Sequence, residues 1–91
     1  IAWRNRIDFY HYSALVDHGR SIGQPKYCTR YIKWIEEHSK IFHYKRYYEF
    51  QYFAYDCTGD IEKRNATLDK MIYLYPYEES FKQLKKQIYS H

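Results

Sequence analysis

Apolar residues recur at intervals of three and four along most of the chain, which is the spacing of one face of a helix. No stretch of any length alternates apolar and polar positions in the manner of a half-buried strand. Between Arg4 and Asp17 this spacing predicts a first helix that ends at Gly19. Two glycines and a proline predict a loop from Gly19 to Pro25, after which the next helix begins. The inward-facing positions expected in the first helix are Ile7, Phe9, Tyr10 and Ala14.

The stretch from Tyr27 to Cys57 is the longest part of the chain without glycine or proline, and it is rich in aromatic residues. Its spacing predicts two neighbouring apolar stripes, interrupted by the polar residues from Glu36 to Lys40. These polar residues form either the solvated face of one long helix or a short connection between two helices, and the sequence leaves both alternatives open. The first stripe comprises Cys28, Tyr31, Ile32, Ile35 and Phe42, extended by Phe53 and Cys57, and the second comprises Ile41, Tyr44, Tyr48, Tyr52 and Tyr55.

The two cysteines of the chain distinguish these alternatives. In one continuous helix, Cys28 and Cys57 would lie ~43 Å apart, because each residue advances a helix by ~1.5 Å. A disulfide requires Cα atoms within about 7 Å of each other, so it could not form. A fold-back near Ser39 would bring both cysteines to the same end of a hairpin, where a bond or a contact becomes feasible.

Beyond Cys57 the sequence predicts two further helices. Gly59 is typical of the residue just past a helix, and Asp60 can cap the next one, which runs to about Tyr75. Pro76 stops that helix, and the last one follows Glu78. Expected inward positions are Ile61, Leu68, Ile72 and Tyr75 in the former and Phe81, Leu84 and Ile88 in the latter, with Lys82, Lys85 and Lys86 solvated. We therefore expect an all-α small bundle of about four or five helices with a long or broken aromatic-rich central helix.

Ninety-one residues form one domain, 1–91, that buries only a little over ~60% of its unfolded surface. Thirteen tyrosines are more than such a core can hide, so we expect an aromatic contact patch, through which a homodimer could also form. Since the chain starts at Ile1 and its one methionine is Met71, we expect a processed form or a fragment.

Fifteen Lys and Arg residues against eleven Asp and Glu give a net charge of +4, which favours an acidic or glycosylated protein partner. The positive charges are scattered, so nucleic acid is not expected as a direct ligand. No apolar run approaches the ~20 residues of a membrane-spanning helix.

The five histidines do not have the spacing of a metal site. His11 and His18 are seven positions apart, and His38 and His43 are five, whereas two ligands on one helix face need a separation of four. We predict neither a metal nor another cofactor.

Catalytic patterns are equally lacking. Cys28 or Cys57 could serve as a nucleophile in principle, but buried thiols of this kind are more often inert. Glu36 and Glu37 are adjacent and point to different sides of a helix, so they cannot share acid–base work. We do not expect an enzyme.

Two segments resemble the sperm lysins of marine snails, which are basic, aromatic-rich, secreted helical bundles. The run His18-Gly19-Arg20-Ser21-Ile22 is similar to the His-Gly-Arg-Thr-Leu corner that precedes their long central helix. Gly59-Asp60 and the residues after it, Lys63, Ala66, Leu68, Lys70, Ile72 and Leu74, are similar to their Gly-Asp segment. The resemblance implies a non-enzymatic gamete-recognition protein that acts on an egg coat or membrane surface. It also implies that Arg20, Lys63 and Lys70 face an acidic partner and that aromatic patches mediate self-association.

A second resemblance is to tetratricopeptide repeats and their half-a-TPR relatives in RNA-processing complexes. It is carried by Tyr48, Tyr55, Gly59-Asp60, Leu68, Ile72 and Pro76, which look like the large residue, tyrosine, turn, second-helix positions and closing proline of a repeat. A poorer copy lies upstream at Tyr12, Leu15, Gly23, Cys28, Ile32 and Ile35. This resemblance implies a stack of helical hairpins with a break between Ile35 and Ile41, and it needs neighbouring repeats for stability.

Both resemblances lead to a non-enzymatic helical bundle that binds a protein. We rank the secreted gamete-recognition protein slightly ahead, because the repeat does not explain the His-Gly-Arg corner. The alternative is a helical-repeat scaffold or accessory subunit of a large protein or RNA-processing assembly, located in the nucleus or an organelle. The partner-binding residues expected are Arg20, Lys63, Lys70, Trp34, Tyr44, Tyr48 and Tyr52.

Overall fold

The computed structural model describes residues 2–38 and 45–89, with side chains from residue 6 onward. Within these residues the chain consists of α-helices joined by short turns, and it contains no strand. The all-α prediction is therefore confirmed, as is the small bundle of about four or five helices. The helices are α1 (Ala2–Ile22), α2 (Pro25–His38), α3 (Lys45–Thr58), α4 (Ile61–Leu74) and α5 (Glu79–Tyr89).

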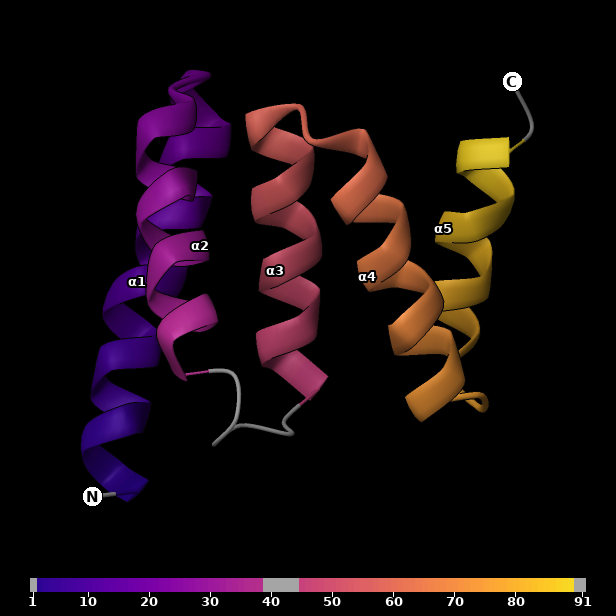
Figure 1. Ribbon diagram of the computed structural model, residues 1–91, viewed down its shortest axis with the longest axis horizontal. Coiled ribbons are helices and arrows are strands. Elements are labelled where there is room, and N and C mark those ends of the chain that lie inside the picture. The colour runs from indigo at the N-terminus through magenta and orange to yellow at the C-terminus, as the bar shows by residue number, and fades with distance from the viewer. Residues whose placement is uncertain (1, 39–44, 90–91) are drawn as a thin grey trace.

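The five helices form a row in which each helix packs against the next one in the sequence, and α1 also contacts α3 (Figure 1). The α1–α2 pair stands at one end of the row and α5 at the other, so the molecule is elongated, with extents of 39 × 29 × 18 Å. The helix α3 lies in the middle and has neighbours on both sides.

The aromatic stretch from Tyr27 to Cys57 forms two helices and not one. The helix α2 ends at His38, α3 begins at Lys45, and a disulfide joins Cys28 to Cys57 with a Cα–Cα distance of 6.4 Å. One continuous helix would separate these atoms by ~43 Å, so the single-helix alternative is wrong. The helix ends within the polar segment, as the hairpin alternative required, although Ser39 and Lys40 lie outside the described residues.

The corner between α1 and α2 differs from the predicted loop. Gly19 lies inside α1, which continues to Ile22, and only Gly23 and Gln24 separate the two helices. A Cβ atom on Gly19 would lie 2.9 Å from the carbonyl oxygen of Gln24 and 3.1 Å from Cys28 Sγ, so glycine permits the close approach of the helices. Gly23, with φ of 67°, is the residue that ends α1, and the Gln24 N–H donates to the Gly19 carbonyl at 2.8 Å.

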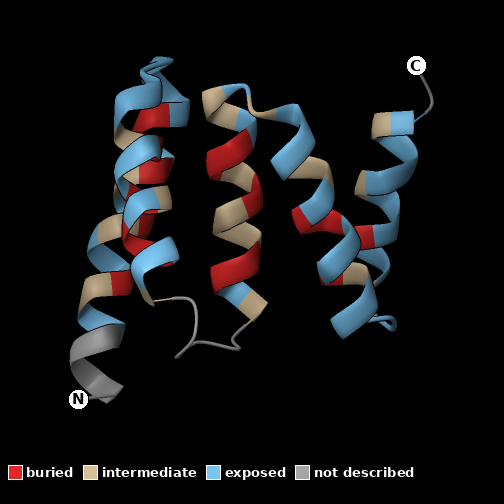
Figure 2. Ribbon diagram, viewed as in Figure 1, coloured by how far each residue is buried: buried red, intermediate tan, exposed pale blue. Residues whose placement is uncertain are grey.

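The hydrophobic core has two parts, with α3 contributing to both (Figure 2). The first part fills the space among α1, α2 and α3, and the second fills the space among α3, α4 and α5. Because α3 buries residues on both sides, its aromatic side chains belong mostly to the core. The buried residues of the first part are Phe9, Val16, Cys28, Tyr31, Trp34, Ile35, Tyr47 and Ala54, and those of the second are Tyr48, Tyr52, Leu68, Met71 and Phe81.

The inward face predicted for the first helix is wrong except at Phe9. Ile7 and Tyr10 are 55% and 69% exposed, and Ala14 is exposed as well. The buried face instead follows Phe9, Ser13, Val16 and Gly19, whose spacing is equally helical. Ser13 and Gly19 are small and lack an apolar signal, yet they let α1 approach its neighbours closely, which explains why the pattern of large apolar residues selected the wrong face.

The second half of the chain follows the prediction closely. Gly59 has φ of 79°, and Asp60 caps α4 by accepting a hydrogen bond from the Lys63 N–H at 3.2 Å. The helix ends at Leu74, two residues before Pro76. The exception is Ile61, which is about half exposed and not inward, because α4 turns Leu68 and Met71 toward α3 instead.

Candidate partner-binding groove

A groove of about 400 Å³ runs between α3 and α5, and α4 provides its floor. It exists because the backbones of α3 and α5 stay apart: no Cα atom of α5 comes within 8 Å of one in α3, and side chains of the second core part lie between them. The side chains of the second core part reach the surface here, so most of the lining is apolar. The lining residues are Glu49, Tyr52, Phe53, Met71, Ser80, Phe81, Gln83, Leu84 and Gln87.

The floor and the rim of the groove differ in chemistry. Met71 and Phe81 are buried beneath it, while Leu84 is half-buried and presents an apolar side to it. Ser80, Gln83 and Gln87 lie on α5 along the rim and are exposed. Glu49 adds a carboxylate on the α3 wall. An apolar floor with a few polar groups beside it is the usual composition of a binding site.

Beyond the lining residues, an ion pair joins the start of α3 to the turn before α5. Lys45 Nζ at the start of α3 lies 3.2 Å from Glu78 Oε1, just before α5. The hydrogen bond from Lys45 lowers the pKa of the Glu78 carboxyl, and the same bond raises the pKa of Lys45. The pair thus ties the two walls together where both helices begin.

At the end toward the C-terminus of α3 the groove is lined by Phe53, and Arg20 lies over the ring of this residue. The Arg20 Cζ atom lies 4.1 Å from the centre of the Phe53 ring, and Phe53 itself lines the groove. Arg20 also lines a second, more polar hollow of about 230 Å³, together with Asp56, Cys57 and residues of the α1–α2 corner. The Arg20–Phe53 pair therefore stands between an apolar groove and a polar hollow.

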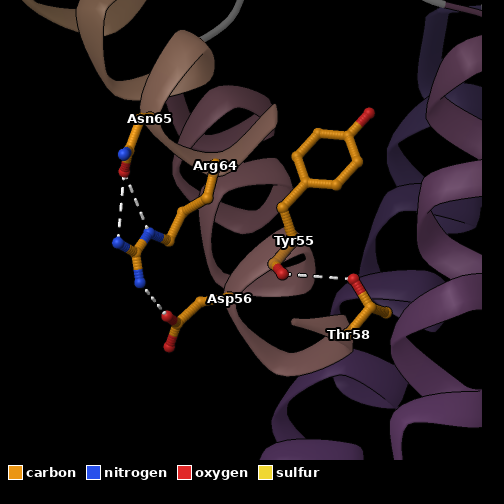
Figure 3. Close-up of polar contacts among 5 residues, drawn as sticks. All are labelled: Tyr55, Asp56, Thr58, Arg64 and Asn65. Atoms are coloured by element: carbon orange, nitrogen blue, oxygen red, sulfur yellow. Dashed lines mark hydrogen bonds and ion pairs between the residues drawn. The ribbon is translucent and has the colours of Figure 1, made fainter. Parts of the chain in front are cut away.

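Beside this end, a network of polar contacts fastens α4 to α3 (Figure 3). Arg64 Nη1 donates to Asp56 Oδ1 at 2.7 Å, and Nε and Nη2 donate to Asn65 Oδ1 at 3.2 and 3.1 Å. The Thr58 hydroxyl donates to the Tyr55 carbonyl at 3.1 Å and closes the last turn of α3. Arg64 is thus held in place by a carboxylate and an amide, with most of its side chain covered.

The three basic residues expected to bind a partner do not lie together. Each is placed over an aromatic ring of α3: Arg20 over Phe53 at 4.1 Å, Lys70 over Tyr48 at 5.5 Å and Lys63 over Tyr55 at 5.9 Å. Lys63 and Lys70 come from α4 and are exposed, whereas Arg20 comes from α1. Of the three, only Arg20 adjoins the groove.

The expected aromatic contact patch needs correction. Trp34, Tyr48 and Tyr52 are 5%, 8% and 6% exposed, so they belong to the core of the chain and do not form an open surface. Trp34, for example, stacks on the Tyr12 ring at 5.0 Å. Their burial follows from the packing of helices on both sides of α3, and Tyr52 alone also forms part of the groove wall. Tyr44 lies outside the described residues.

Apart from Tyr52, the residues that line the groove were not singled out from the sequence as partner-binding residues. Phe53, Phe81 and Leu84 appeared there as core positions, which is what they are in part. The available signal was weak: Gln83 and Gln87 lie four apart, one helical turn, beside the apolar stripe of α5. The gap between α3 and α5 arises from the way the helices pack, and the local spacing of apolar and polar residues does not predict it.

Within residues 6–38 and 45–89, no group of three or more His, Cys, Asp and Glu side chains is placed to hold a metal ion. None of the helices described is long and apolar enough to span a bilayer. The chemistry that the groove itself offers is apolar burial, hydrogen bonding and the carboxylate of Glu49, with the charge of Arg20 next to it over the Phe53 ring.

Comparisons with family models, with curated proteins and with solved structures found no match to this chain. The functional inferences below consequently depend on the groove, the charges around it and the resemblances of the sequence.

Proposed function

We propose that the chain is a non-enzymatic helical scaffold that binds a segment of a partner protein in the groove between α3 and α5. The observation that carries this proposal is the groove itself, an apolar hollow of about 400 Å³ with a polar rim. Such a hollow is large enough to bury one or two large side chains of a partner, and it leaves the rim to hydrogen-bond the partner backbone.

The hairpin arrangement supports the repeat-like alternative. The helices α3 and α4 form a hairpin in which Tyr48 and Tyr55 are buried and Asp60 caps the second helix, as the resemblance to a tetratricopeptide repeat implies. The helix α2 ends at His38, between Ile35 and Ile41. The long central helix implied by the lysin resemblance is replaced by two helices of fourteen residues. We therefore place the scaffold function ahead of the gamete-recognition function.

Filling the groove should abolish partner binding without unfolding the chain. Gln83 is exposed and lines the groove, so Gln83→Trp would occupy the space meant for a partner side chain while leaving the core intact. We expect peptides selected from a phage library of random dodecapeptides to bind the unchanged chain and to lose at least about tenfold in affinity for Gln83→Trp.

The matched control is Ala66→Trp, which adds the same side chain at an exposed position of α4 away from the groove. It should bind the selected peptides as the unchanged chain does. A selection that yields no binder, or binders insensitive to Gln83→Trp, would contradict the proposed site.

A secreted protein that contacts an acidic surface is the second candidate. The disulfide between Cys28 and Cys57 favours it, because such bonds persist in oxidising compartments, and so does the net charge of +4. If this function holds, a sialic-acid-rich glycoprotein should bind the chain, and added salt should weaken that binding by screening. Glycoprotein binding that salt leaves unchanged would count against this candidate.

A further inference from the structure

We propose that the α3–α5 groove is selective for an acidic segment, in which an apolar side chain fills the groove and a neighbouring carboxylate pairs with Arg20. The inference rests on the proposed function and specifies the chemistry of the partner. Since Phe53 both lines the groove and carries Arg20 over its ring, the apolar anchor and the carboxylate must lie close together in the partner.

The ion pairs around the groove leave Arg20 as an unbalanced positive charge. Lys45 is paired with Glu78 at 3.2 Å and Arg64 with Asp56 at 2.7 Å, so the charges of these cations are compensated. In the part of the chain that the structure describes, Arg20 has no carboxylate partner. A carboxylate brought in by a partner would supply one.

The position of Arg20 leaves it able to bind such a group. A guanidinium over a ring uses its face for the contact, and its N–H donors project from the edges of its plane. The planar fork matches the two oxygens of a carboxylate, and the ring beneath restricts the side chain before the partner arrives. The neighbouring polar hollow, which Arg20 also lines, gives an acidic side chain room to approach.

Two acidic groups of α3 lie near the proposed site: Glu49 lines the groove, and Asp56 lines the polar hollow together with Arg20. Glu49 is one helical turn before Phe53, toward Lys45, and its charge helps to raise the pKa of Lys45. Asp56 is held by Arg64. The groove thus has a carboxylate in its lining at Glu49, while the positive charge of Arg20 lies over the Phe53 ring.

Charges of both signs act on the Tyr52 hydroxyl in the groove wall. Burial raises its pKa, the charge of Arg64 lowers it, that of Asp56 raises it, and that of Arg20 lowers it.

The test uses an array of peptides with acetylated N-termini and amidated C-termini. Each peptide contains one Leu, Phe or Trp and one Glu, Gln or Lys, and the array covers every sequence separation between the two residues up to one heptad. Their blocked ends remove terminal charges as a cause of binding. We expect one separation at which the Glu peptide binds about tenfold more tightly than its Gln counterpart, with the Lys peptide weakest.

Arg20→Gln should remove the preference for Glu while leaving the affinity for the Gln peptide unchanged. Arg30→Gln, which removes an exposed arginine of α2 that does not line the groove, should keep the preference. Equal loss for Glu and Gln peptides in Arg20→Gln would mean that Arg20 merely positions Phe53, and it would overturn the inference.

The array also separates the inference from the function on which it rests. Suppose that peptides bind with no preference among Glu, Gln and Lys and that their binding is lost in the Gln83→Trp chain. This result would refute the acidic selectivity and leave the groove as the binding site. If no peptide loses binding in the Gln83→Trp chain, both the acidic selectivity and the groove as the binding site are refuted.

Discussion

Replacing Cys28 and Cys57 together by alanine is expected to lower the free energy of unfolding by about 3 to 4 kcal/mol, which is a large part of the stability of a domain this small. The bond spans a sequence separation of 29 residues and restricts the unfolded chain accordingly. It also links the start of α2 to the end of α3, so its loss acts on the first core part. Urea denaturation of the oxidised chain and of the double variant measures the difference.

The single variants provide the control. Because either substitution removes the whole bond, Cys28→Ala, Cys57→Ala and the double variant should be destabilised by similar amounts, with strong non-additivity. Reduction of the unchanged chain should reproduce the loss. Additive single effects, or a urea midpoint that reduction leaves unmoved, would contradict a stabilising bond between these residues.

Raising the pH above about 10 is expected to unfold the chain steeply, because it contains tyrosines whose neutral form is favoured by folding. Burial raises the pKa of Tyr31, whose hydroxyl donates to the Tyr47 carbonyl at 2.9 Å. Burial and the hydrogen bond to Glu36 raise the pKa of Tyr55 to about 12. In the unfolded chain these groups ionise near the ordinary tyrosine pKa of about 10.

The direction in which stability changes with pH follows from these raised pKa values. At a pH below the tyrosine pKa of the unfolded chain, the tyrosines are protonated in both the folded and the unfolded state, and their contribution to stability is fully present. This contribution is lost as the pH rises from there through the pKa values of the folded chain. Urea midpoints measured from neutral pH to pH 12, with tyrosinate absorbance followed in parallel, test this, since the part of the absorbance that comes from buried tyrosines such as Tyr31 and Tyr55 should appear together with unfolding. Tyrosinate that forms completely while the helices persist would contradict it.

Tyr31→Phe should make the alkaline transition less steep and cost about 1 kcal/mol at neutral pH through the lost hydrogen bond. Tyr73→Phe is its control at neutral pH, because Tyr73 is 83% exposed and its substitution should leave the urea midpoint unchanged there.

The sequence was sufficient for the elements whose boundaries are set by local chemistry. Gly59, Asp60 and Pro76 act within a few residues of themselves, so the start and end of α4 followed from residue type. The sequence also identified the Cys28–Cys57 distance as the quantity that distinguishes one helix from two, because this distance differs by tens of ångströms between the two alternatives. It could not choose between them, since the polar segment after Ile35 fits a solvated helix face and a turn equally well.

The faces of the helices were harder to predict than their bounds. Periodicity marked Ile7 and Tyr10 as inward because they are large and apolar, whereas close packing of α1 depends on Ser13 and Gly19. Tyr48 and Tyr52 were assigned to a partner because a small core seemed too small for so many rings. With buried faces on both sides, α3 accommodates them, and we propose that a partner binds instead at the gap beside Phe53 and Leu84.

A central helix with two buried faces also explains how the groove keeps its shape. One wall is α3, which the disulfide and Tyr31 hold to α2, and the Arg64–Asp56 pair holds to α4. The other wall is α5, fixed by Phe81 in the second core part and by the ion pair of Lys85 with Asp69 at 3.3 Å. A partner segment would therefore meet a largely preformed site, which lowers the entropic cost of binding.

The most direct test of the groove as the partner site is an amide NMR titration of the oxidised chain with the tightest-binding amidated peptide of the array. Binding in the groove predicts that the largest shifts occur at Phe53, Gln83 and Leu84, extend to Arg20 for the Glu peptide, and vanish in Gln83→Trp. Shifts confined to α2, or to the side of α4 that carries Lys63 and Lys70, would contradict it.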